Sequence, residues 1–271
     1  MLTSFRKAQQ SSITRLAALE SIGALPAPYA GARLPFAAGL KKRGPGAVIA
    51  EYKRASPSLG DINLGLEPEE VASLYARAGA SAFSVLTEGA HFKGDVDFLA
   101  RMAGPGLPML RKDFLLHPLQ VEETAATPAS ALLLIVRMHD AAALVAMLNA
   151  AKRFGLEAVI EVFSRDDLNK ARQALAESET VAGGLPAIIQ VNNRDLDTLI
   201  LSETPSRELI ALKRDGEIWI SASGVTRRDQ VIERARLGFD AVLVGSSIMR
   251  ERDPGEALAR LTGTALVEKG Q

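Results

Sequence analysis

Eight short apolar runs recur along the chain and predict the strands of one sheet. Each is rich in β-branched or aliphatic residues, as is typical of a buried strand. In chain order they are AVIAEYK from Ala47, SAFSVLT from Ser81, MLRKDF from Met109, ALLLIV from Ala131, AVIEVF from Ala158, AIIQVNN from Ala187, WISASG from Trp219 and AVLVGSS from Ala241.

Segments with helical patterning separate these runs. Residues 67–80 open with acidic residues and end near Gly79, and residues 139–155 carry Asp140 near their start. Residues 226–240 begin with a threonine that can cap a helix and stop near Gly238. Acidic or capping residues at the start and glycine at the end are common helix-end signals. The alternation of strand and helix predicts a parallel sheet with helical crossovers.

The number of these units selects the architecture. Eight units within about 220 residues favour a closed (β/α)₈ TIM barrel over an open doubly wound sheet. No G-x-G-x-x-G motif follows the first strand, which counts against a Rossmann fold. Since no low-complexity linker divides the chain, we expect a single domain, with a helical extension over residues 1–46 and the barrel over 47–271. The extension is expected to hold two helices, which either pack on the barrel or cover one of its mouths.

Composition narrows the class of protein. The chain has 32 basic and 32 acidic residues, and this balance argues against non-specific nucleic-acid binding, which needs a clustered basic surface. Cysteine is absent, which excludes disulfides and thiol chemistry and fits a reducing compartment. The N-terminus lacks the apolar core of a signal peptide, and no apolar stretch approaches the roughly 20 residues of a membrane span. We therefore expect a cytoplasmic protein without a nucleic-acid or membrane partner.

Charged residues interrupt three predicted strands near their carboxyl ends, where barrels of this kind place active sites. These residues are Glu51, Lys53, Lys112 and Glu161. Because side chains alternate between the two faces of a strand, each of them shares a face with apolar residues two positions away. Any one of them alone is as well explained by a solvated surface position. The four together can converge only if they face the barrel axis, where unpaired charges are costly and are normally paired or used. Two lysines beside two glutamates suit acid–base chemistry.

Small residues follow the last two predicted strands. Gly224 precedes a helix in SASGVTRRD, and Gly245 and Ser246 precede a turn in LVGSSIMRERD. The loops after strands 7 and 8 are the recurrent phosphate site of these barrels, because backbone N–H groups and helix N-termini favour anions there. With Lys53 nearby, we expect a phosphorylated substrate. The three histidines lie far apart in the sequence, so a histidine-based zinc site is not expected.

Seven motifs together resemble the indole-3-glycerol phosphate synthase family. In the family's order and spacing they are VIAEYKRASPS, SVLTEGAHFKG, LRKDFLL, IEVFSRDDL, VNNRDL, SASGV and VLVGSSIMRERDP, between about Leu34 and Leu261. The resemblance implies a (β/α)₈ barrel whose N-terminal extension covers the active-site mouth, in a monomer or weak homodimer. It also implies the substrate 1-(2-carboxyphenylamino)-1-deoxyribulose 5-phosphate, and no metal or organic cofactor.

The resemblance further implies roles for individual residues. Lys112 would be the principal acid in ring closure, Glu161 a general acid or base, and Lys53 the holder of a phosphate or carboxylate that shares the acid role. Glu51 would orient the lysines, and Asn192 and Ser223 would complete the catalytic set. The substrate-binding positions would be Gly224, Gly245 and Ser246 at the phosphate, Phe92 and Phe114 flanking the anthranilate ring, and Ser56 and Arg194 elsewhere in the site.

Two positions depart from the family pattern. Ala222 stands in SASG where the family usually has glutamate, and Gln190 stands where it usually has glycine. A carboxylate of the expected catalytic set is therefore missing, while Gln190 shares strand parity with Asn192 and is expected to project into the barrel. We expect slower or altered chemistry, from either a weakened synthase or a paralogue acting on a related anthranilate-derived sugar phosphate.

Three other functions fit the sequence less well. A Schiff-base aldolase on the same barrel needs a neutral lysine in an apolar pocket, whereas here each lysine has a glutamate nearby. A barrel that only binds a phosphorylated ligand stays open, because fold alone does not establish catalysis. The neighbouring isomerase of the tryptophan pathway is disfavoured. It shares neither the charged motifs at the strand ends nor the small-residue motifs after the last two strands, and it normally uses a cysteine, which this chain lacks.

Overall fold

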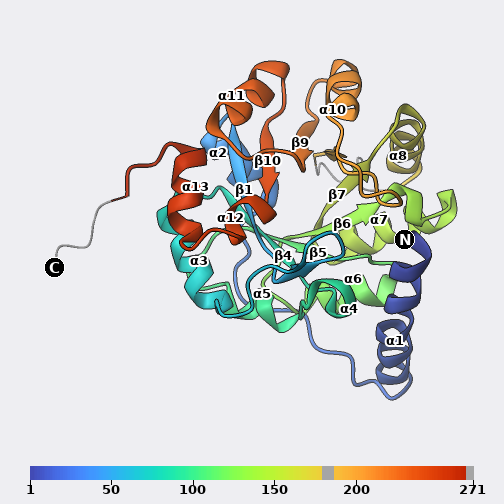
Figure 1. Cartoon of the computed structure of the whole chain (residues 1–271). Coiled ribbons are helices and arrows are strands. Elements are labelled where there is room, and N and C mark those ends of the chain that lie inside the picture. Colours follow the sequence, from blue (N-terminus) through green and yellow to red (C-terminus); the bar gives the residue numbers. More distant parts are fainter. Residues whose placement is uncertain (179–185, 267–271) are drawn as a thin grey trace.

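Eight parallel strands close into a barrel in the order β1-β10-β9-β8-β7-β6-β5-β4, with β4 paired to β1 (Figure 1). The structure, a computed structural model, describes residues 1–178 and 186–266, so residues 179–185 and 267–271 of the predicted barrel segment lie outside it. The strands are β1 (Ala47–Tyr52), β4 (Ala82–Leu86), β5 (Met109–Lys112), β6 (Ala131–Ile135), β7 (Glu157–Val162), β8 (Ile188–Asn192), β9 (Ile218–Ala222) and β10 (Ala241–Val244). All eight predicted runs form these strands, and the predicted (β/α)₈ barrel is confirmed.

Helices surround the barrel, and a small antiparallel pair, β2 (Ala55–Ser56) and β3 (Gly60–Asp61), follows β1. After the N-terminal extension the helices are α3 (Pro68–Arg77), α4 (Gly89–Phe92), α5 (Asp97–Arg101), α6 (Pro118–Ala125), η1 (Val136–Met138), α7 (Ala141–Arg153), α8 (Arg165–Glu177), α10 (Thr204–Leu209), η2 (Ile210–Leu212), α11 (Arg228–Leu237), α12 (Ser246–Met249) and α13 (Pro254–Thr262). Among the described residues, no helix combines the length and the hydropathy that a membrane span requires.

The predicted helix-end signals hold at Asp140 and Gly238 and fail at Thr226. The Asp140 carboxylate accepts the backbone N–H of Ala143 at 2.8 Å, which caps α7. Gly238 ends α11 with φ at 107°, a left-handed conformation that glycine adopts without strain. Thr226 was expected to cap α11, and this was wrong. The N-cap is Arg227, one residue later, and the Gln230 side chain accepts the backbone N–H groups of Thr226 and Arg227.

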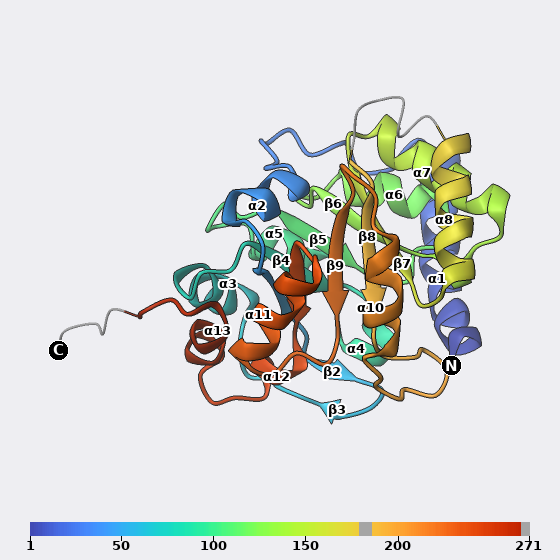
Figure 2. The ribbon, with the colours of Figure 1, turned by 90° about the horizontal axis from the view of Figure 1, so that it is seen from above.

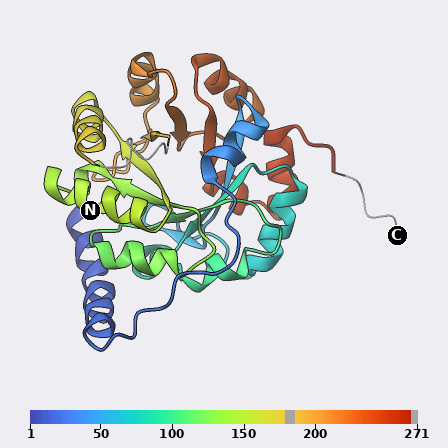
Figure 3. The same cartoon turned by 180° about the vertical axis from the view of Figure 1, so that it is seen from behind.

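The N-terminal extension forms two helices that reach opposite ends of the barrel. α1 (Leu2–Ser21) packs beside α6, and its first turn lies near the mouth that carries β2 and β3 (Figure 2). α2 (Phe36–Arg43) lies at the other end, where Phe36 and Leu40 join the core formed by the inward faces of the strands. The Glu157 carboxylate at the start of β7 accepts the backbone N–H of Ala37 at 3.3 Å and also that of Phe36. The chain between the two helices is visible from behind the barrel (Figure 3).

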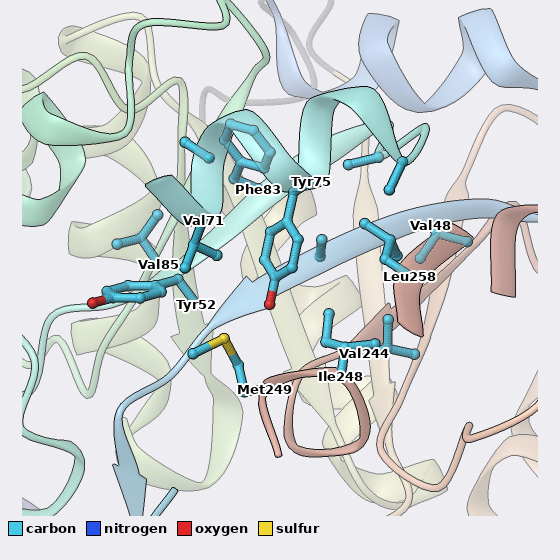
Figure 4. Close-up of a cluster of buried hydrophobic side chains, with 14 of the residues drawn as sticks. Val48, Tyr52, Val71, Tyr75, Phe83, Val85, Val244, Ile248, Met249 and Leu258 are labelled. Atoms are coloured by element: carbon cyan, nitrogen blue, oxygen red, sulfur yellow. The ribbon is translucent and has the colours of Figure 1, made fainter. Parts of the chain in front are cut away.

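A cluster of buried side chains between the barrel and its helices supports the carboxyl end of β1. Val48, Val71, Val85 and Leu258 pack there between β1, β4, α3 and α13 (Figure 4). Within this cluster the Tyr75 hydroxyl donates to the backbone carbonyl of Glu51 at 3.2 Å. Burial of the aromatic ring thereby also fixes the direction in which the end of β1 points.

His139, which follows η1, is a buried titratable group, and we expect it to make stability depend on pH. Burial lowers its pKa to about 4, from 6.5, with Arg6 and Lys170 adding to the effect and a hydrogen bond with the Leu115 backbone opposing it. Between these values the unfolded chain binds the proton and the folded chain does not, so stability falls as the pH drops from about 6.5 to 4. The loss is on the order of 3 kcal/mol.

Urea unfolding at pH 7 and pH 4.5 measures this effect. A His139→Gln variant, which does not titrate in this range, should lose less stability than the native chain over the same interval. Equal losses in the two proteins would show that His139 does not cause the pH dependence.

Candidate active site

A cavity of about 320 Å³ opens at the carboxyl ends of the barrel strands, within the range of small-molecule sites. Each residue that the sequence assigned to the site lies on its wall, although the strands that supply them are far apart in sequence. They are Glu51, Lys53, Ser56, Phe92, Lys112, Phe114, Glu161, Asn192, Arg194, Ser223, Gly224, Gly245 and Ser246. Barrel closure therefore brings the predicted set together.

Glu51 and Lys53 form the first charged pair. Glu51 is the penultimate residue of β1, and its side chain is 6 % exposed. Its Oε1 atom lies 2.9 Å from Lys53 Nζ, and its Oε2 atom accepts the Ser84 hydroxyl at 3.4 Å. Lys53 itself stands just beyond the strand, with a side chain 13 % exposed. A buried carboxylate that is paired on one oxygen and hydrogen-bonded on the other holds the ammonium group in a defined place.

Lys112 and Glu161 form the second pair, from β5 and β7, which flank β6 on the same side of the barrel. Lys112 Nζ lies 3.7 Å from Glu161 Oε2, and the Glu161 side chain is fully buried. The same Oε2 atom accepts a hydrogen bond from the side-chain amide of Gln190. The Oε1 atom of Glu161 has no hydrogen-bond partner among the residues that the structure describes.

A buried polar network on the outer side of β5 holds the strand that carries Lys112. Asp113 accepts hydrogen bonds from the Thr87 hydroxyl and from the Gln9 amide of α1, the latter at 2.9 Å. Arg111, 1 % exposed, bonds to Thr87 and pairs with Asp113 at 3.3 Å. Because strand residues alternate between faces, these outward groups leave Lys112 directed inward. The N-terminal helix is thus connected by hydrogen bonds to the strand beneath Lys112.

Three aromatic rings form one wall of the cavity. Phe5 of α1 stacks on Phe114 with ring centroids 3.9 Å apart and an interplanar angle of 11°. Phe92, from α4, lies 5.9 Å from Phe114 and 6.2 Å from Phe5. Sequence reasoning identified Phe92 and Phe114 but missed Phe5. An apolar residue near the start of an amphipathic helix gives no signal that separates a site residue from a packing residue.

Asn192 and Ser223 are joined at the ends of β8 and β9. The Asn192 Oδ1 atom accepts the Ser223 hydroxyl at 2.9 Å and the Arg194 backbone N–H at 3.0 Å. Ser223 has φ at 69°, a conformation that is uncommon for a residue other than glycine. Gly224 follows with φ at 88°, so the backbone after β9 turns sharply beside the cavity. Such an unusual backbone is found most often where a site requires it.

The other end of the cavity is formed by glycines and cationic side chains. Gly245 lies so close to Glu51 that a Cβ atom on it would stand 2.4 Å from Glu51 Oε1. Ser246 begins α12, and its carbonyl accepts the Arg250 guanidinium at 3.1 Å. Arg250, which sequence reasoning did not select, also lines the cavity. The proximity of backbone, Arg250 and Lys53 suits an anionic group.

The two departures noted in the sequence lie next to the charged pairs. Ala222 is the last residue of β9, pairs in register with Asn192, and presents only a methyl group to the cavity. Gln190 is fully buried and pairs in register with Glu161 on the neighbouring strand. Its side chain points into the barrel, because its amide reaches Glu161.

The histidines have separate surroundings. His91 lies between the Ser4 hydroxyl, 2.8 Å from Nε2, and Glu88, 3.0 Å from Nδ1. His117 caps α6, and His139 is buried in the core. In the two ranges that the structure covers, no group of three or more potential ligands is arranged to hold a metal ion.

The chain is similar to proteins of one named family. The family model described as indole-3-glycerol phosphate synthase matches residues 6–261. The enzyme of that name from Carboxydothermus hydrogenoformans is 38% identical over 213 residues, covering 78% of this chain and 77% of the relative. That from Aquifex aeolicus is 38% identical over 219 residues, covering 80% and 81%.

Similar solved structures have other names. The 3-hexulose-6-phosphate synthase from Salmonella typhimurium matches with a TM-score of 0.60 at 16% identity, over 80% of this chain and 97% of that chain. At this identity the similarity shows the barrel fold alone.

Proposed function

This chain belongs to the indole-3-glycerol phosphate synthase family, and on that premise we propose that it closes the pyrrole ring of 1-(2-carboxyphenylamino)-1-deoxyribulose 5-phosphate. The reaction releases carbon dioxide and water and yields indole-3-glycerol phosphate for tryptophan biosynthesis. The observation that supports the assignment of residues is the convergence of two lysine–glutamate pairs on one cavity.

Ring closure needs an acid at the ketone oxygen. When the anthranilate ring carbon attacks the ketone carbon, negative charge develops on that oxygen and a positioned acid stabilises it. Lys112 donates this proton, and Glu161, 3.7 Å away, balances the ammonium charge before transfer. The bond from the ring carbon to its carboxylate then breaks, carbon dioxide leaves, and the released electron pair restores the aromatic ring.

Dehydration needs an acid for the departing hydroxyl and a base for the carbon-bound proton that is lost as the indole double bond forms. Lys53, the second ammonium group at the cavity, protonates the hydroxyl, and Glu161 accepts the carbon-bound proton. Glu51 orients Lys53 through their 2.9 Å contact and faces the substrate hydroxyls. One bond to oxygen and one to hydrogen break, and water is the product.

The two ends of the cavity orient the substrate. The anthranilate ring lies against Phe92 and Phe114, and Phe5 extends the same wall. The phosphate lies at Gly224, Gly245 and Ser246, with Arg194, Ser56 and Lys53 beside the sugar. Asn192 and Ser223, which are hydrogen-bonded to each other, hold the reacting part between these ends.

Steady-state assay of the native chain with this substrate, followed by indole absorbance or fluorescence, tests the function. Ala222 has no carboxylate at the position where the family usually has glutamate. We therefore expect turnover at least roughly tenfold below that of the Aquifex aeolicus relative. Ala222→Glu should raise kcat roughly tenfold, since its side chain points into the cavity next to Asn192.

Ala222→Gln is the matched control, because it has nearly the same volume without the carboxylate. An increase in kcat with glutamate but not with glutamine would assign the effect to charge. If the native chain is as fast as the relative and Ala222→Glu changes nothing, Ala222 does not limit the reaction.

The absence of a carboxylate at Ala222 also favours a second candidate function. A chain that forms no product from this substrate, but turns over a related anthranilate-derived sugar phosphate, would be a paralogue with altered specificity. The expectations of a cytoplasmic location, of a monomer or weak homodimer, and of action without a cofactor stay predictions.

A further inference from the structure

Gln190 is a buried polar side chain that the proposed chemistry does not use. It lies on β8, two residues before Asn192. It has no exposed surface and does not line the cavity. A buried amide is costly unless it is hydrogen-bonded. Its one hydrogen bond among the described residues runs from Nε2 to Glu161 Oε2, and its Oε1 atom has no partner there.

This hydrogen bond makes the two oxygens of Glu161 unequal. Oε2 accepts the amide of Gln190 and faces Lys112 Nζ at 3.7 Å. Oε1 has no hydrogen-bond partner in the part of the chain that the structure describes, and Glu161 lies on the cavity wall. Gln190 therefore holds Oε2, whereas Oε1 is a buried acceptor that no described residue holds by a hydrogen bond.

We propose that Gln190 is a positioning residue that anchors Glu161 through Oε2 and so leaves Oε1 as the atom that takes the proton during dehydration. The inference rests on the proposed function, because it assigns an atom to the base of that reaction. Gln190 touches neither the cavity nor the substrate and acts through Glu161 alone.

A glutamine suits this task better than a charged residue. A neutral amide adds no further charge to the barrel interior, where lysine or arginine would need a partner of its own. It also carries both a donor and an acceptor. When Glu161 takes the proton on Oε1, Oε2 becomes the carbonyl oxygen of the acid and can still accept the amide hydrogen of Gln190. Contact with Glu161 can thus persist in both protonation states of the carboxyl group.

Neither Ala222 nor Asn192 offers a substitute for this contact. Ala222 on β9 carries no polar atom in its side chain, and the Asn192 Oδ1 atom is already occupied by Ser223 and Arg194. Among the described residues, the one hydrogen bond to the Glu161 carboxylate therefore comes from β8, beside its ion pair with Lys112. In this chain the polar group that holds Glu161 is the side-chain amide of Gln190, which does not line the cavity.

A Gln190→Met variant tests the proposal, because methionine has a similar volume and no hydrogen-bonding group of comparable strength. Misplacement of a catalytic group by about 1 Å costs up to roughly 10²-fold, so we expect kcat to fall roughly 30- to 100-fold with KM changed less than threefold. The melting temperature should stay the same or rise, since the buried amide with its unpartnered oxygen is removed. Gln173→Met, at an exposed position on α8, is the control and should leave kcat within twofold.

Gln190→Glu gives a second, independent readout. A protonated carboxyl group can donate to Glu161, whereas an ionised one cannot and repels it. The ratio of the variant's kcat to that of the native chain should therefore decline as the pH rises from about 5 to 8.

Three results would overturn the inference while the native chain is active. They are kcat within twofold in Gln190→Met, a loss that appears only in KM, and a flat pH ratio in Gln190→Glu. An inactive native chain would instead contradict the proposed function, so the two failures are distinguishable.

Discussion

Replacing Lys112 by methionine is expected to lower kcat by about 10³-fold, with KM changed only a few-fold. Lys112 is the ammonium group that faces Glu161, at 3.7 Å, and the proposed acid of ring closure. General acid catalysis is typically worth 10²- to 10⁴-fold, and methionine keeps the length and apolar stem of lysine without the proton. Steady-state kinetics, with circular dichroism to verify folding, measure the effect.

Two comparisons sharpen this result. Lys53→Met removes the other ammonium group, which is proposed both to bind an anionic part of the substrate and to donate a proton, and should therefore raise KM as well as lower kcat. Lys93→Met removes a lysine that pairs with Asp61 outside the cavity and should leave kcat within twofold. Retention of more than a tenth of the native kcat by Lys112→Met would rule out Lys112 as the principal acid.

Adding one methyl group at Gly245 is expected to lower kcat/KM by about 10²-fold or more. A Cβ atom there would lie 2.4 Å from Glu51 Oε1 and 3.0 Å from its Cβ and Cδ atoms, so Glu51 must move. Its 2.9 Å contact with Lys53 would be lost, and the methyl group would also stand at the position proposed for the phosphate. Misplacing a catalytic group by about 1 Å already costs up to roughly 10²-fold.

Gly104→Ala is the matched control, because a Cβ atom there meets no other atom within 4 Å. It should leave kcat/KM within twofold, while Gly245→Ala should also lower the melting temperature, as overpacking typically costs 1–3 kcal/mol. Native-like kcat/KM in Gly245→Ala would mean that Glu51 can move without consequence. The proposed orienting role of Glu51 would then be wrong.

The two faces of β5 show how the barrel separates tasks. Lys112 points to the cavity, while Arg111 and Asp113 point outward into a buried network with Thr87 and with Gln9 of α1. Alternation along a strand puts chemistry on one face and its support on the other. The helix that carries Phe5 to the aromatic wall therefore also holds the strand of the proposed acid.

Much of this arrangement could be predicted from the order of residues alone. Strand and helix periodicity encode which positions are buried, and eight repeats in a chain of this length leave few architectures. Strand parity then placed Glu51, Lys112 and Glu161 on inward faces without knowledge of any neighbour. Their presence on one cavity wall follows from closure of the barrel, which the repeat number predicted.

Other features could be decided only by the tertiary structure. The stacking of Phe5 on Phe114, the contact of Gly245 with Glu51 and the hydrogen bond from Gln190 to Glu161 join segments far apart in the chain. Patterning of apolar and polar residues records that a side chain is buried, but not which side chain it meets. The sequence by itself therefore determined the barrel and its inward-facing charged residues. The packing of distant segments decided which oxygen atoms of their carboxylates accept hydrogen bonds.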